Sequence, residues 1–175
     1  MAVTAAAVKE LREKTGLPMM DCKKALTECD GDQQAAVQWL RERGAQVFEK
    51  RAGRTTAFGR FGLYIGLEKN TGAMVELKCE SAPVTTNEEF IQYANDLAEA
   101  LANNPDISDA DSLLALNTPS QPGMTLGDVK NDLFNRIREV FNVGRMIRLE
   151  GGCGGYSHNA GTVSGVLLAA DGNDD

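Results

Sequence analysis

The 175-residue sequence contains few of the residues from which catalytic and metal sites are built. It has one histidine, His158, and four cysteines, none of which forms a Cys-x-x-Cys pair. Because structural zinc sites need four Cys or His ligands, usually in close pairs, we expect no metal site. Cys22 and Cys29 lie on one expected helix about two turns or roughly 10 Å apart, which is too far for a disulfide. Widely spread cysteines favour reduced thiols in a cytoplasmic protein.

Long hydrophobic runs are also missing. No segment approaches the roughly 20 consecutive apolar residues that a membrane helix needs, so no membrane partner is expected. Residues 1–7 are small and apolar but have no basic region and no long apolar stretch, which argues against a signal peptide. The content of 42% hydrophobic and 25% charged residues is typical of a globular protein.

Positive charge is scarce outside the first third of the chain. Residues 1–60 hold 11 Lys and Arg against 8 Asp and Glu, a balance of +3, whereas residues 61–175 hold 7 against 17, a balance of −10. Nonspecific nucleic-acid binding depends on neutralising phosphates, so this acidic body argues against it. A protein partner with a complementary face suits the charge distribution better.

The beginning of the chain has a helical period. Thr4 is placed to cap a first helix that stops at Gly16. Pro18 suits the first turn of a second helix. Asp32 caps a third helix, which we expect to end at Gly44. The residues expected to face the core of this bundle are Val8, Leu11, Met19, Cys22, Leu26, Cys29, Ala36, Val37 and Leu40.

From residue 61 the period changes from helical to alternating. Strands and helices that succeed one another without regular β-α-β order favour an α+β fold, with an antiparallel sheet and helices on one face. Thr125 and Asp128 have the spacing of a capping box. We expect a three-helix domain over 1–45, a linker over 46–60 and the α+β core over 61–175. The expected elements of the core are strands at 61–67, 75–79, 146–149 and 163–169, helices at 87–102 and 126–140, and a flexible glycine-rich connection at 151–155.

None of the arrangements that suggest chemistry is complete. The glycine-rich run 151–155 resembles a phosphate loop but lacks the Lys-Ser/Thr ending and does not begin a helix. Cys153 and His158 have no evident third group to orient them as nucleophile and base. Glu88 and Glu89 point about 100° apart on a helix and suit its N-terminus. We expect no catalytic residue, no cofactor and no small-molecule substrate.

Met19 and Met20 call for a separate explanation. Adjacent residues diverge on a helix, so they cannot both face the bundle core. Because Met19 continues the core stripe, we expect Met20 to point outward beside Lys23 and Lys24 and to give an adaptable contact for a partner. The pattern equally allows a methionine at the helix end folded over Leu17.

At this point the residues resemble a known family. The run from Val8 to Leu26, with Thr-Gly at 15–16 and Met-Met-Asp-Cys-Lys-Lys-Ala-Leu at 19–26, resembles the N-terminal module of bacterial elongation factor Ts. The segments 75–80, 87–90 and 156–161 are similar to the core subdomain of the same family. The resemblance implies a ubiquitin-associated-like (UBA-like) three-helix domain and a core with a three-stranded antiparallel sheet. It also implies guanine-nucleotide exchange on the GTPase elongation factor Tu, without bond making.

The resemblance further implies which residues bind the partner. The N-terminal module grips the nucleotide domain, a turn after the second strand pushes near the Mg²⁺ and switch region, and a histidine of the terminal hairpin adds a contact. By match, the implied partner-binding residues are Leu11, Met19, Met20, Lys23, Ser81, Ala82, Pro83, Val84 and His158.

The chain departs from the family pattern at two places, in this turn and at the end of the second long helix. Ser-Ala-Pro-Val at 81–84 replaces Thr-Asp-Phe-Val, so the intruding acidic and aromatic side chains are absent. Ile-Arg-Glu-Val at 137–140 stands where the family usually has Ile-Gly-Glu-Asn. Three hypotheses remain open: an exchange factor for elongation factor Tu, a binding-only protein that docks on this or another GTPase, and a binder of ubiquitin-like folds through the loop 15–17.

Overall fold

The computed structural model describes residues 3–51 and 53–170. The chain forms two compact units. Unit 1 consists of residues 1–53 with 131–138, and unit 2 of residues 54–130 with 139–175. The expected division into domains at 1–45 and 61–175 stays a prediction.

Unit 1 contains the helices α1 (Ala5–Thr15), α2 (Met19–Glu28) and α3 (Gln33–Arg51). The expected caps are confirmed. The hydroxyl of Thr4 accepts a hydrogen bond from the backbone N–H of Ala7 at 3.2 Å, and Gly16 ends α1 with φ +69°. The carboxylate of Asp32 accepts from the backbone N–H groups of Gln34 and Ala35 at the start of α3. These side chains satisfy donors that the first turn of a helix leaves without partners.

The three helices bury one small core. Leu11, Cys22 and Leu26 have no exposed surface, and each of the two fully buried leucine side chains contributes about 1.5–3 kcal/mol. The prediction that Met19 belongs to this core is wrong, because Met19 is 52% exposed. Leu17, in the loop before α2, is buried in its place. The buried core residues are Val8, Leu11, Leu17, Cys22, Ala25, Leu26, Ala36 and Leu40.

Helix α3 is longer than the sequence pattern indicated. It passes through Gly44 and continues to Arg51, so the prediction of a helix end at Gly44 is wrong. Gly44 is a point of close approach within unit 1, because a Cβ atom there would collide with the side-chain amide of Asn135. A glycine inside a helix is often explained by such packing.

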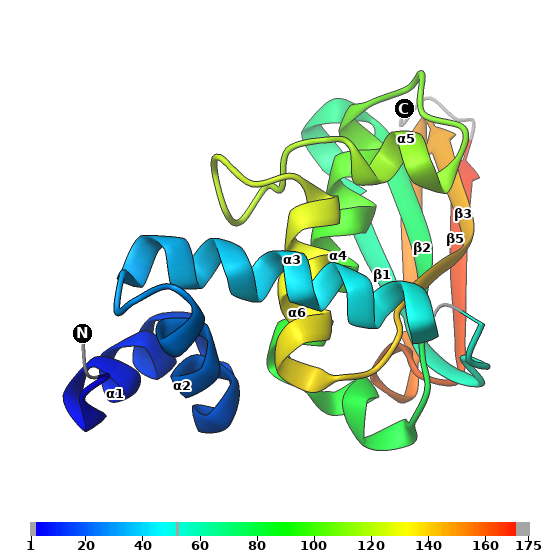
Figure 1. The fold of residues 1–175 in the computed structure, drawn as a ribbon. Coiled ribbons are helices and arrows are strands. Elements are labelled where there is room, and N and C mark those ends of the chain that lie inside the picture. The colour runs from blue at the N-terminus through cyan, green and yellow to red at the C-terminus, as the bar shows by residue number, and fades with distance from the viewer. Residues whose placement is uncertain (1–2, 52, 171–175) are drawn as a thin grey trace. The chain divides into compact units, whose positions relative to one another are not determined.

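Unit 2 is built on a three-stranded antiparallel sheet. The strands β1 (Phe58–Gly66), β2 (Thr71–Cys79) and β3 (Asn142–Glu150) lie in the order β1-β2-β3, and helix α4 (Glu88–Asn103) packs on one face (Figure 1). The amide oxygen of Asn87 caps α4 by accepting from the backbone N–H of Phe90. The α+β class with a helix-covered sheet is therefore confirmed.

Two further helices come after α4 along the chain. They are α5 (Ala110–Leu114) and α6 (Leu126–Ile137). Thr125 and Asp128 form the predicted capping box: the backbone N–H of Asp128 donates to the Thr125 hydroxyl, and the backbone N–H of Thr125 donates to the Asp128 carboxylate, both at 3.0 Å.

A hairpin covers the other face of the sheet. Its strands are β4 (Gly152–His158) and β5 (Ser164–Ala170). The prediction of a flexible connection over 151–155 is wrong, because these glycines belong mostly to β4. They permit close packing: a Cβ on Gly155 would lie 2.9 Å from a methyl group of Leu63 on the sheet. Leu67 also differs from its prediction, since it is 77% exposed in the short 3₁₀ turn η1 (Leu67–Lys69) and not part of β1.

No helix among residues 3–51 and 53–170 is long and apolar enough to cross a membrane.

Candidate protein-binding surfaces

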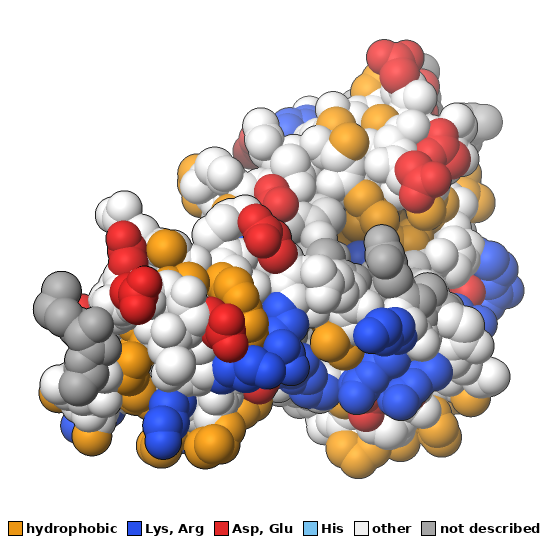
Figure 2. Space-filling view, viewed as in Figure 1, with side chains coloured by type: hydrophobic (Ala, Val, Ile, Leu, Met, Phe, Trp, Pro, Cys, Tyr) orange, Lys and Arg blue, Asp and Glu red, His pale blue; other side chains and the backbone are white. Residues whose placement is uncertain are grey.

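The first candidate surface lies on unit 1, at the start of α2. We call Met19, Met20 and Lys23 the α2 surface. Met19 is 52% and Met20 70% exposed, and Lys23 is also exposed. Figure 2 shows hydrophobic side chains beside basic ones over the α1 and α2 region. Two exposed thioethers next to an ammonium group make an adaptable surface with both apolar and charged character.

The loop before α2 holds this surface in place. The hydroxyl of Thr15 donates to the carbonyl of Leu11 at 2.7 Å, and the thiol of Cys22 lies 3.7 Å from the carbonyl of Leu17, to which it donates. Leu17 packs into the core of unit 1, and Met19 and Met20, which follow it at the start of α2, are exposed to solvent. Leu11 is fully buried and cannot touch a partner directly; it supports the surface from beneath.

The second candidate surface is the turn after β2. Residues Ala82–Thr86 form a 3₁₀ turn, η2, which leads into α4. Ala82 and Pro83 are exposed, whereas Val84 is buried and anchors the turn. Within the turn, the hydroxyl of Thr85 donates to the carbonyl of Ala82 at 2.7 Å, and that of Thr86 donates to the carbonyl of Pro83 at 2.9 Å. The turn therefore presents a small, rigid tip.

Two hydrogen-bonded carboxylates hold the base of this turn. Glu139 accepts from the backbone N–H of Ser81 at 3.0 Å and from its hydroxyl at 2.5 Å. The neighbouring residue of each segment forms the reciprocal bond: the carboxylate of Glu80 accepts from the backbone N–H of Val140 at 2.8 Å. Glu80 also forms an ion pair with Arg54 at 3.1 Å. We call the reciprocal bonds among Glu80, Ser81, Glu139 and Val140 the clasp. Hydrogen bonds to charged groups are stronger than neutral ones, so the clasp fixes the turn to the segment before β3.

Cys79, at the end of β2, lies beside the clasp but is not reactive. Its thiol donates to the carbonyl of Ser81 at 3.3 Å. Burial, with a smaller contribution from the negative charge of Glu139, raises the pKa of Cys79 to about 11. A thiol that stays protonated at neutral pH is a poor nucleophile, so Cys79 has a packing role.

His158 lies at the end of β4 and is exposed. Its Nδ1 atom is 3.0 Å from the hydroxyl of Tyr156, and the two rings are tilted with centroids 6.1 Å apart. Tyr156 is 62% exposed. The pair presents an aromatic and polar patch suited to a protein contact, of which the sequence predicted only the histidine. Cys153 and His158 belong to the same strand, β4, but their side chains bond to different groups, the carbonyl of Leu149 and the hydroxyl of Tyr156.

In the part of the chain that the structure describes, no group of three or more His, Cys, Asp or Glu side chains is arranged to hold a metal ion. What the geometry offers is exposed apolar, basic and aromatic side chains on rigid supports, which is the character of a protein-binding surface.

Comparison with known proteins decides the family. The family model described as Elongation factor TS matches residues 80–175, which is more than half of the chain. The chain belongs to the elongation factor Ts family. The match begins at Glu80 and includes the clasp, the turn and the terminal hairpin.

Curated elongation factor Ts proteins extend the similarity to nearly the whole chain. Elongation factor Ts of Clostridium novyi (strain NT) is 40% identical over 169 residues, covering 95% of this chain and 55% of that protein. Elongation factor Ts of Nitratidesulfovibrio vulgaris (strain DP4) is 39% identical over 168 residues, covering 94% and 53%. The chain spans about half the length of the curated relatives it matches.

Sequence reasoning missed the residues that support the turn. Ser81 and Glu139 are separated by 58 positions, and Glu139 stands in no local motif that points to Ser81, so only the fold brings them together. One signal is present in the sequence, since the segment 137–140 departs from the family pattern. Arg138, within it, adopts φ +66°, a conformation that favours glycine.

Proposed function

We propose that this chain binds elongation factor Tu and promotes GDP release by stabilising the nucleotide-free state. Membership of the elongation factor Ts family supports the partner and the reaction type. The single observation that carries the proposal is the turn η2, exposed at Ala82 and Pro83 and held at its base by Ser81 and Glu139. A rigid projection can transmit binding energy to a partner because little is lost in ordering it.

Each of the proposed binding surfaces makes a different contact with elongation factor Tu. Met19, Met20 and Lys23 grip the nucleotide domain through apolar contact and charge. The turn at 81–84 presses on the nucleotide site, and His158 with Tyr156 adds a contact from the hairpin. Leu11 and Val84 act from beneath these surfaces, since both side chains are buried.

Exchange of this kind requires no bond making. A factor that binds the nucleotide-free GTPase more tightly than the GDP-loaded form must weaken GDP binding by the same ratio. A preference of about 100-fold corresponds to about 2.7 kcal/mol, which binding differences at a few side chains can supply. The protein therefore acts as an exchange factor, with no catalytic residue and no cofactor, in the cytoplasm.

The test is GDP release from elongation factor Tu loaded with a fluorescent GDP. Adding the chain at saturating concentration, with excess unlabelled GDP, is expected to increase the release rate at least tenfold. An unchanged rate, with binding demonstrated separately by calorimetry, would contradict the exchange activity and leave the binding proposal standing.

A second candidate function is binding without efficient exchange. The observation that favours it is the composition of the tip, a methyl group at Ala82 and a rigid ring at Pro83, with no acidic or large aromatic side chain. If this function is correct, the double variant A82D/P83F creates exchange activity that the unmodified chain lacks. The matched control is P83A, which removes the ring without adding either group and is expected to leave GDP release unchanged.

The remaining expectations about partners are part of the same proposal. We infer that the chain binds a protein and not nucleic acid, a membrane or a small-molecule substrate. The acidic balance of −10 over residues 61–175 supports the inference against nucleic acid.

A further inference from the structure

Arg60, on strand β1, is a buried cation without a matching anion. Its residue surface is only 9% exposed. Two of its N–H groups donate to backbone carbonyls, those of Thr85 at 2.8 Å and Ala160 at 2.7 Å. Its Nε–H has no partner among the described residues. Nor does any carboxylate in residues 3–51 and 53–170 pair with this guanidinium.

Burial of such a group is costly. A guanidinium offers five N–H donors and a full positive charge, and carbonyl dipoles neutralise that charge only in part. Consistent with this, burial lowers the pKa of Arg60, although the group remains charged at neutral pH. A buried titratable group that has a shifted pKa and lines a cavity is a candidate functional position.

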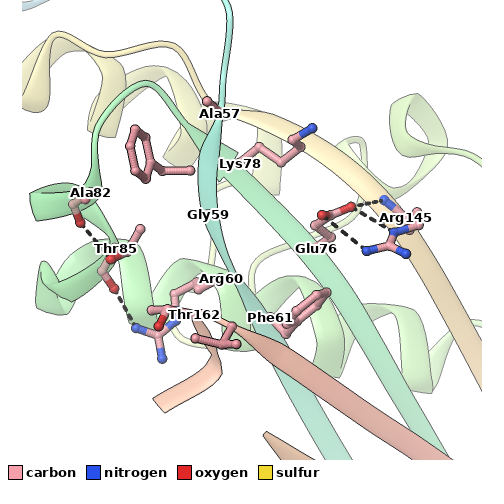
Figure 3. A pocket seen from close by; sticks show the side chains of 12 residues that line it. Ala57, Gly59, Arg60, Phe61, Glu76, Lys78, Ala82, Thr85, Arg145 and Thr162 are labelled. Carbon is pink, nitrogen blue, oxygen red and sulfur yellow. Dashed lines mark hydrogen bonds and ion pairs between the residues drawn. The ribbon is translucent and has the colours of Figure 1, made fainter. Parts of the chain in front are cut away.

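Arg60 lines a cavity of about 380 Å³ that is bordered by residues of β1, β2, β3 and η2 and by Thr162 and Val163 (Figure 3). Lys78 and the pair Glu76–Arg145 also line it, and Arg145 holds Glu76 through its Nε at 3.2 Å. Desolvation acts to raise the pKa of Glu76, but the hydrogen bonds and charge of Arg145 and the charge of Lys78 outweigh it and lower the pKa. Glu76 therefore keeps its negative charge and is paired with Arg145, and the positive charges of Arg60 and Lys78 remain in excess.

The rim of the cavity is apolar. Phe58 is 48% and Val163 63% exposed, and both line the cavity beside its charged wall. Ala82, at the tip of η2, lines it as well. A basic pocket with exposed hydrophobic side chains at its mouth is complementary to an acidic side chain that has apolar neighbours.

We propose that this cavity binds a carboxylate side chain, flanked by apolar residues, from a segment of a protein partner. The carboxylate enters beside Arg60, Lys78 adds positive charge from elsewhere on the cavity wall, and the apolar neighbours of the carboxylate cover Phe58 and Val163. A free phosphate fits less well, because it leaves the apolar rim uncovered and brings a second negative charge toward Glu76. This inference goes beyond nucleotide exchange and holds whichever protein supplies the segment.

The test uses the full ¹⁵N-labelled chain and NMR spectroscopy. The probes are acetyl-Leu-Glu-Leu-amide, its Gln counterpart and inorganic phosphate, each at constant ionic strength and pH 7. The Glu peptide is expected to shift the Nε–H resonance of Arg60 and the amides of residues 58–61 saturably. The Gln peptide should bind about fivefold more weakly, as expected for loss of about 1 kcal/mol from one partly exposed ion pair. Equal affinities for the two peptides, or shifts confined to other surfaces, would overturn the proposal.

Variants separate the cavity from general charge effects. R60M keeps the apolar stem and removes the charge, and it is expected to weaken the Glu peptide at least fivefold. K78M is the second variant, to be used if R60M does not fold, because the Lys78 ammonium is in no ion pair within the described chain. K78M should weaken binding of the Glu peptide two- to threefold. An unchanged affinity would refute the site. K69M, a lysine of unit 2 outside the cavity, is the matched control and should bind normally. Phosphate that binds as tightly as the Glu peptide would also overturn the choice of a protein segment.

Discussion

Glu139 receives two hydrogen bonds from Ser81, one from the backbone N–H at 3.0 Å and one from the hydroxyl at 2.5 Å, although 58 positions separate the two residues. The bonds tie the exposed turn at 82–83 to the start of the segment leading into β3. Rigid presentation of the turn depends on this pair.

Removing the Ser81 hydroxyl is expected to destabilise unit 2. The S81A variant loses the bond to the charged carboxylate but keeps the backbone bond, so its free energy of unfolding should fall by about 2 kcal/mol. Urea unfolding followed by circular dichroism measures the loss. T86A is the control, because its exposed hydroxyl donates only to the carbonyl of Pro83. A loss in S81A no larger than that in T86A would show that the clasp contributes little.

Arg138 adopts the left-handed conformation with φ +66°, which strains any residue that has a Cβ atom. Comparing R138G with R138A isolates this strain, because both variants lose the ion pair that Arg138 makes with Asp21. R138G is expected to be more stable than R138A by about 1 kcal/mol in urea unfolding. Greater stability of R138A, the better helix former, would contradict the assigned conformation.

The raised pKa of Cys79 leads us to expect that the folded chain loses stability at alkaline pH. Its pKa is raised from 9.0 to about 11 in the folded chain, first by burial and then by Glu139. A raised pKa means that the contribution of the neutral thiol to stability is fully present below pH 9.0 and is lost as pH rises toward 11. Melting temperatures from about pH 7 to about pH 10.5 should therefore fall more steeply for the unmodified chain than for C79A. Parallel curves for the two proteins would show that Cys79 does not contribute.

A substitution at Met20 tests the proposal that the α2 surface binds elongation factor Tu. The M20D variant places a charge on a side chain that is 70% exposed, so folding should be unaffected while affinity for elongation factor Tu falls at least tenfold. Titration calorimetry measures the affinity. L67D is the matched control, because Leu67 is 77% exposed but lies in unit 2, outside the proposed surfaces. Equal binding by M20D and the unmodified chain would reject the α2 surface.

Local signals predicted the elements that depend on neighbouring residues. Thr4 and Asp32 accept hydrogen bonds from the first turns of their helices, and such caps can be recognised from about four residues of sequence. The alternation of Val75 and Leu77 predicted the second part of β2, where one strand face meets α4, although the strand begins earlier, at Thr71. These features need no knowledge of distant contacts.

Tertiary packing decided the features that were predicted wrongly. Met19 continues the helical stripe, yet Leu17 fills the core position that Met19 was expected to occupy. Gly44 has the pattern of a helix end but serves as a contact point with Asn135, and Gly155 has the pattern of a flexible loop but packs against Leu63. In each case the observed structure is determined by a residue distant in sequence or by a loop residue that lies outside the helical repeat.

The candidate binding residues were only partly accessible to sequence reasoning. Met20, Pro83 and His158 were predicted from a motif and are exposed, so their positions are compatible with partner contact. The roles of Glu139 and Arg60 could not be predicted from neighbouring residues, because each acts through contacts that only the folded chain creates.

The most direct test of the proposed function compares the affinity of the chain for nucleotide-free and for GDP-loaded elongation factor Tu. Titration calorimetry under the same buffer conditions gives both dissociation constants. An exchange factor is expected to bind the nucleotide-free form at least tenfold more tightly, since that ratio equals the weakening of GDP binding. Equal dissociation constants for the two forms would contradict the central claim and show that the chain binds without releasing nucleotide.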